Sequence, residues 1–131
     1  MVVQPALEGD IHLFYIVEEI GTRRPMELSA LEQHAMLAII ALQPSAYGIS
    51  IQDHISRQGG YEPSVGSIYA ALDRLEEKGF VKSRQGEATP ERGGRRKLYF
   101  SVTAPGESAL REALRATGKL SRAAGWQEVP A

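Results

Sequence analysis

Apolar residues recur every three or four positions along most of this chain, a spacing that predicts helices. Ser29 and Glu32 form a capping-box pair, so a helix is predicted over 30–42. That helix is apolar almost all round and is expected to lie at the centre of the core. A second helix is predicted over 46–58, where Gly59 follows. Its inner side carries Tyr47, Ile51 and Ile55.

A third helix is predicted to begin at Ser64, a good N-cap residue, and to end before Gly79, where a C-cap glycine belongs. The side expected to face the core carries Val65, Ile68, Leu72 and Leu75. The opposite side carries Gly66, Ser67, Ala70, Asp73, Arg74 and Glu77. The N-terminal half of that outer side is small and polar, as a helix that reads a DNA groove needs to be.

The apolar period then changes from that of a helix to that of a strand. One strand is predicted over 80–84 and another over 98–102, joined by a long loop over 85–96 that contains proline and glycines. Three helices followed by two strands with a long tip predict a winged helix-turn-helix over 28–103. The fold class is therefore mainly α with a small β-wing.

A last helix is predicted over 104–125, capped by Thr103. Its apolar stripe is narrow, which suits a seam between two helices better than a broad core, so we expect a C-terminal dimerisation helix. The expected interface residues are Leu110, Ala113, Leu114, Thr117, Leu120 and Ala124. Residues 1–27 form an N-terminal extension, interpreted either as one short amphipathic helix, which could assist the dimer, or as a loose terminal segment; 126–131 form a tail.

Charge is distributed unevenly along the chain. The net charge of -1 and the pI of 6.3 argue weakly against a nucleic-acid partner. Residues 64–100, however, sum to +3, whereas 1–63 sum to -5 and 101–131 to +1. A basic middle beside an acidic first half indicates a localised anionic partner.

Several classes of protein find no support in the sequence. There is no cysteine, so disulfides and thiolate metal sites are excluded. The three histidines are not spaced as metal ligands, and no catalytic constellation is found, so we expect no enzyme and no cofactor. No apolar run is long enough to cross a membrane and no signal peptide is evident, so a cytoplasmic location is expected.

Three segments resemble the PadR family of bacterial winged-helix regulators. Residues 67–81 (SIYAALDRLEEKGFV) resemble its recognition helix and first wing strand, 46–49 (AYGI) the start of its second helix, and 95–103 (RRKLYFSVT), with Gly106, its second wing strand and final helix. The resemblance implies a homodimer on a palindromic operator in double-stranded DNA, usually a repressor and in some members released by a small-molecule effector. This sequence departs from the family in three places: at Ala70, where proline is common, in its longer N-terminal extension, and in its short C-terminal part.

The expected DNA contacts lie on the third helix and the wing. They are Tyr47, Ser64, Ser67, Tyr69, Ala70, Arg74, Arg92, Arg95, Arg96 and Lys97. Two alternatives stay open: Tyr69 is either a phosphate contact or a partly buried core aromatic, and the wing cations either bind DNA or form a solvated loop. A winged-helix module that binds a protein and no DNA is the competing function.

Overall fold

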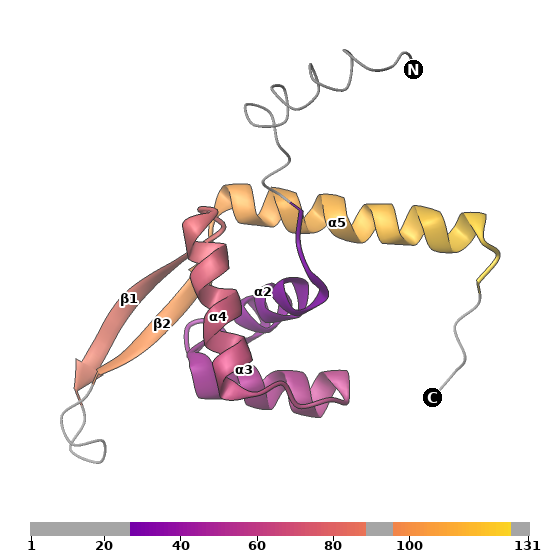
Figure 1. Cartoon of the computed structure of the whole chain (residues 1–131). Helices are drawn as coiled ribbons and strands as arrows, with labels where there is room; N and C mark the ends of the chain where they lie inside the picture. The colour runs from indigo at the N-terminus through magenta and orange to yellow at the C-terminus, as the bar shows by residue number, and fades with distance from the viewer. Residues whose placement is uncertain (1–26, 89–95, 127–131) are drawn as a thin grey trace, which may run out of the picture.

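The computed structural model describes residues 27–88 and 96–126, with the backbone alone at 87, 88 and 96. Along the chain lie α2 (Ala30–Leu42), α3 (Gly48–His54), the π-helical turn η1 (Ile55–Gly59), α4 (Val65–Glu77), β1 (Val81–Ala88), β2 (Arg96–Val102) and α5 (Ala104–Ala123). The three-helix body, the two-stranded wing and the long α5 match the expected fold class (Figure 1). The expected N-terminal helix lies outside the described residues.

The core lies where α2, α3 and α4 meet. Its largest fully buried apolar side chains are Met36, Ile39, Ile51, Ile68, Leu72 and Leu75. The central place expected for α2 is confirmed, since Ala35, Met36 and Ile39 are fully buried in this core. Leu37 and Ile40, on the same helix, are exposed. Val65 was expected to face the core and is also exposed, since it stands in the first turn of α4, before the helix reaches its neighbours.

The second helix begins at Gly48, two residues later than predicted, because the preceding segment joins the wing. The Phe100 N–H donates to the Ala46 carbonyl (2.8 Å). The side-chain amide of Gln43 donates in turn to the Phe100 carbonyl (2.7 Å). Residue 46 is therefore held against the free edge of β2 by this backbone hydrogen bond, which places Tyr47 beside the wing.

The antiparallel wing is longer than the predicted strands. Val81 pairs with Val102 and Arg84 with Tyr99, and after a register shift Ala88 pairs with Arg96. Pairing continues past Gly86 because the Tyr99 ring covers this residue, where a Cβ atom would overlap the ring. The predicted loop over 85–96 therefore shortens to the residues between the two strands.

The first two turns of α5 are fixed to the body, and the remainder extends beyond it (Figure 1). The Thr103 hydroxyl donates to the Gly79 carbonyl (2.7 Å) and accepts from the Gly106 N–H (3.1 Å). Gly106 touches the Phe80 carbonyl so closely that any Cβ atom there would overlap it. Leu110, expected in a seam between protomers, is instead buried in the protomer's own core, with 4% of its surface exposed.

Candidate nucleic-acid interface

The N-terminal half of α4 presents a small, polar and exposed surface. Ser64 caps the helix: its hydroxyl oxygen accepts from the Ser67 N–H (3.0 Å), and its hydroxyl donates to the Ser67 hydroxyl oxygen (2.9 Å). With both of these bonds made, the Ser67 hydroxyl keeps its own proton for an outside acceptor. Gly66 and Ala70 are also exposed, so nothing large shields this surface.

Tyr69 stands on the flank of α4 and closes the space between α4 and α3. A Cβ atom at Gly48 would overlap the Tyr69 hydroxyl and ring, so the ring rests directly on the backbone at the start of α3. The side chain is still 42% exposed. It is therefore a partly buried aromatic with an accessible edge, as one of the two interpretations expected, and its contact with a phosphate stays a prediction.

The outer face of the wing consists of Lys82, Arg84, Lys97 and Tyr99, because these residues alternate with the strand positions that face the core. Val81 and Phe100, on the opposite face, are buried. Every charged side chain described on the outer face is basic. The outer face is thus a strip of three cations and one aromatic ring.

Tyr47 joins this strip to the helical body. Its ring packs edge-on against Tyr99, with ring centroids 5.7 Å apart and planes at 81°. The Lys97 ammonium lies 4.2 Å from the centroid of the Tyr47 ring, and the Arg84 guanidinium 4.9 Å from that of Tyr99. Since Tyr47 precedes Gly48, on which Tyr69 rests, the surface runs continuously from α4 to the wing.

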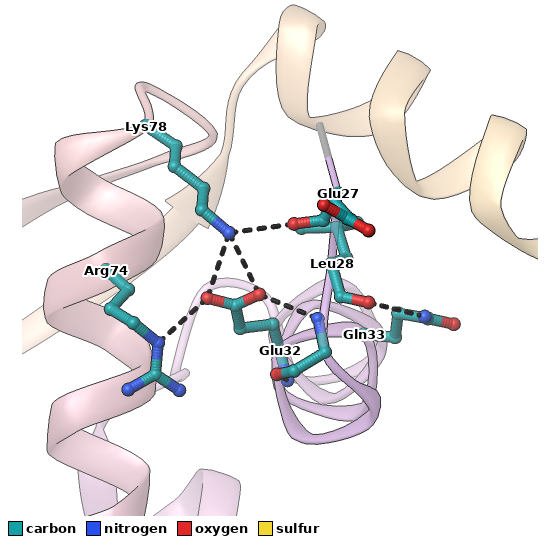
Figure 2. A network of polar contacts seen from close by, with 7 residues as sticks. Glu27, Leu28, Glu32, Gln33, Arg74 and Lys78 are labelled. Atoms are coloured by element: carbon teal, nitrogen blue, oxygen red, sulfur yellow. Dashed lines mark hydrogen bonds and ion pairs between the residues drawn. The ribbon is translucent and has the colours of Figure 1, made fainter. Parts of the chain in front are cut away.

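Arg74, a predicted DNA contact, is bonded within the protein by its Nε (Figure 2). Its Nε donates to Glu32 of α2 (3.0 Å), and half of the side chain, 49%, remains exposed. Lys78, one turn further on, donates to both Glu32 oxygens (3.0 and 3.1 Å) and to the Glu27 carbonyl (2.9 Å). The second half of α4 is thereby tied to the start of α2.

Glu32 is the buried centre of this network, with 2% of its surface exposed. Burial raises its pKa, but the bonds from the Ser29 N–H, Lys78 and Arg74 outweigh burial and leave the pKa below its ordinary value. The carboxylate also completes the predicted capping box by accepting from the Ser29 N–H (2.8 Å). One side chain therefore caps α2 and orients α4.

Three of the predicted wing contacts fall in the sequence between β1 and Lys97. Arg92 and Arg95 lie outside the described residues, and of Arg96 only the backbone is described. Sequence reasoning missed Lys82, Arg84 and Tyr99, although their alternation with apolar strand positions was a usable signal. It also missed Gly48 and Glu32, whose partners lie far away along the chain.

The described side chains form no metal-binding cluster, and the described helices form no membrane span. His34, through its Nδ1, shares a hydrogen bond with the Tyr61 hydroxyl (2.6 Å), so it already has a partner. Across residues 27–88 and 96–126, no three His, Asp or Glu side chains are grouped to hold a metal ion. No helix in these ranges has the length and apolar character needed to cross a membrane.

The far part of α5 continues the stripe that buries Ala109 and Leu110, but beyond the body no residue of 27–88 or 96–126 buries it. Leu120 is 71% exposed, and Leu114, Thr117 and Ala124 are exposed as well, whereas Ala113 is half-buried. The uncovered stripe thus consists of Ala113, Leu114, Thr117, Leu120 and Ala124.

Solved structures share this fold. A PadR-like transcription factor from Bacteroides fragilis is 23% identical, with a TM-score of 0.61 over 83% of this chain and 96% of that one. A PadR family transcriptional regulator from Eggerthella lenta is 21% identical, with a TM-score of 0.59 over 88% and 94%. A PadR-like transcriptional regulator from Bacillus cereus is 23% identical, with a TM-score of 0.58 over 72% and 87%.

A comparison with curated proteins gives no match. The sequence profile of the transcriptional regulator PadR-like family matches residues 36–112, which span the helical body, the wing and the fixed part of α5. This match covers more than half of the chain, and the solved structures agree with it in fold. The chain therefore belongs to the PadR-like family of transcriptional regulators.

Proposed function

We propose that this protein is a dimeric, sequence-specific DNA-binding repressor. The observation that carries the proposal is the continuous surface from the exposed start of α4, through Tyr69 and Tyr47, to the basic outer face of the wing. A small polar helix face suits the major groove, and a strip of cations beside it suits the phosphates that flank a groove. Repression follows from a bound dimer covering the promoter, and release by a small-molecule effector is a further part of the proposal.

Within this surface the two elements have different tasks. Ser67 stands near the start of α4 with a free proton and is proposed to contact a base edge. Ser64 and Ala70 are small enough for α4 to approach the bases closely, and the exposed edge of Tyr69 is proposed to face the DNA phosphate backbone. Arg74 keeps its bond to Glu32 and contacts a phosphate rather than a base, because reading a base would pull it away from a buried carboxylate.

Salt-dependent DNA binding tests the role of the wing. Each phosphate neutralised adds about -0.9 to the slope of log K against log salt. Arg84→Ala with Lys97→Ala should therefore weaken binding to all sequences alike and flatten the slope by roughly 2 per protomer. The matched control is Arg111→Ala with Arg115→Ala on α5, which should leave the slope unchanged. An unchanged slope in the wing variant would remove the wing from the interface.

Selection of binding sites from a random library tests α4. Ser67→Gln should change the selected base at one position in each half-site, at a cost of about 1–3 kcal/mol on the original site. The half-sites should lie about one helical turn apart, since a two-fold dimer presents both reading helices to one face of the duplex. If neither the wild type nor the variant selects any consensus sequence above background, the alternative of a module that binds a protein and no DNA is the better account.

The uncovered stripe of α5 is proposed as the dimer interface, because a second copy would bury the same stripe on both protomers. Leu120→Asp should give a folded monomer in sedimentation, since Leu120 makes no buried contact within the protomer. Leu110→Asp should instead unfold the protein, because it places a charge in the core. A wild type that sediments as a monomer at micromolar concentration would refute the dimer.

A further inference from the structure

We propose that Tyr47 and Tyr99 are positioning residues that hold Lys97 and Arg84 in place for the DNA phosphates. The inference rests on the proposed function and adds to it a mechanism for the wing. The four side chains form a row in which each ring carries one cation, and the two rings meet edge to face. The row begins on β1, crosses β2 and ends on the residue that precedes α3.

The geometry of each contact is that of a cation on the face of an aromatic ring. The distances of 4.2 Å for Lys97 and 4.9 Å for Arg84 lie within the range, about 6 Å, in which the ring quadrupole attracts a cation. The two rings meet at 81° with centroids 5.7 Å apart, an arrangement in which the edge of one ring faces the other. Each contact therefore supports the next.

A ring holds a cation without cancelling its charge, and this is the reason for assigning the row a role in binding. Lys78 and Arg74 show the contrast, because the buried carboxylate of Glu32 neutralises part of their charge. Lys97 and Arg84 have no described carboxylate in hydrogen-bonding contact, and the side of each cation away from the ring can still donate to a phosphate. Long basic side chains lose much rotamer freedom on binding, and a side chain already held in place loses less.

The row also fixes where the wing cations stand relative to α4. Tyr47 is joined through the backbone to Gly48, and Gly48 is in direct contact with Tyr69. Ala46, on the other side of Tyr47, pairs with the backbone of Phe100 in β2. Tyr47 is thus held from both sides, and the distance between the helix that reads the groove and the cations beside it is set by packed contacts.

A mutant cycle on the pair Tyr47 and Lys97 tests the proposal, with affinity for the selected operator as the readout. Tyr47→Phe keeps the ring and should retain wild-type affinity within about twofold. Tyr47→Leu should weaken binding about two- to fivefold per protomer, the range of one exposed cation–ring contact. In the Lys97→Ala background, Tyr47→Leu should cost clearly less than in the wild type, because only the support that reaches Arg84 through Tyr99 is left to lose.

The outcomes separate the possible causes. Equal losses for Tyr47→Phe and Tyr47→Leu would overturn the proposal by showing that the hydroxyl contacts DNA. Additive losses in the cycle would overturn it by showing that Tyr47 acts independently of Lys97. Should Tyr47→Leu unfold, the same cycle on Tyr99 and Arg84 decides the matter. If the wild type binds no DNA, the proposed function is overturned. If the wild type binds DNA and the losses of affinity from Tyr47→Leu and Lys97→Ala simply add in the double variant, only this inference is overturned.

Discussion

Replacing Glu32 with glutamine should destabilise the protein through a network that spans two helices. The amide oxygen, in place of Oε1, can still accept from the Ser29 N–H and from Lys78. The amide NH₂, in place of Oε2, then faces the Nε of Arg74 and the same Lys78 ammonium. The amide NH₂ of the glutamine is itself a donor, so it cannot accept the hydrogen bonds from Arg74 and Lys78 that the Glu32 carboxylate accepts at this position. The capping bond survives, and the loss is confined to the ionic part of the network.

The magnitude follows from how deeply each partner is buried. Removing one partner of a fully buried ion pair costs about 3–5 kcal/mol, because the other charge is left uncompensated. Here the partners left behind are partly exposed, 49% for Arg74 and 25% for Lys78, so both can regain water. We therefore expect a loss of about 2 kcal/mol in the free energy of unfolding, below the range for a fully buried pair.

The effect should depend on pH in a defined direction. The pKa of Glu32 is lower in the folded protein than its ordinary value of 4.5, so its charge stabilises the fold above that pH. The contribution is lost as the pH falls below 4.5 and through the folded pKa. The stability gap between wild type and Glu32→Gln should be full at neutral pH and should close on acidification.

Urea unfolding at fixed protein concentration, repeated from pH 7 to pH 3, measures this gap while holding any association constant. The matched control is Asp53→Asn, which breaks an ion pair with Arg57 whose side chains are 58% and 74% exposed. An exposed pair of this kind contributes about 0.5 kcal/mol or less. A Glu32→Gln protein no less stable than this control, or a gap that persists at low pH, would refute the reasoning.

Two glycine substitutions, with a third as a control, test the close contacts that position α5 and Tyr69. Gly106→Ala should destabilise by about 1–3 kcal/mol in thermal unfolding, because the added methyl overlaps the Phe80 carbonyl. Gly118→Ala should instead stabilise α5 by up to about 1 kcal/mol, because the added methyl meets only the Arg122 side chain, at an ordinary contact distance of 3.5 Å. Gly48→Ala should lower both stability and DNA affinity by displacing the Tyr69 ring, and its cost should shrink in a Tyr69→Ala background. Equal changes in stability from Gly106→Ala and Gly118→Ala would contradict the contact at Gly106. A cost of Gly48→Ala that is the same in the wild type and in the Tyr69→Ala background would contradict the contact at Gly48.

Local signals in the sequence predicted most of the fold. The capping box at Ser29, the caps at Ser64 and Thr103, and Gly79, whose φ is 81°, mark helix ends, and each stands where expected. These signals work because a cap is satisfied within three or four residues of its own position. The order of helices and strands, and hence the fold class, follows from them.

Contacts between distant residues could not be predicted in the same way. Glu32 was predicted only as the capping-box partner of Ser29, and its further partners Arg74 and Lys78 come 42 and 46 residues later. Leu110 fits a dimer stripe by spacing, but spacing alone does not distinguish a partner helix from the protomer's own core. The strand extension past Gly86 depends on a ring from the opposite strand. In each case the missing information is what the side chain faces.

The far half of α5 has a thermodynamic consequence for the proposed dimer. After Leu110 this helix runs to Ala123 without another buried residue, a length at which an isolated helix is only marginally stable in water. Its helical order then depends on the partner that covers the stripe, so helix formation and association become one coupled equilibrium. Protection of the α5 amides from hydrogen exchange should therefore rise with protein concentration beyond Leu110 and stay constant before it. The helical order of this segment thus depends on how much protein is present.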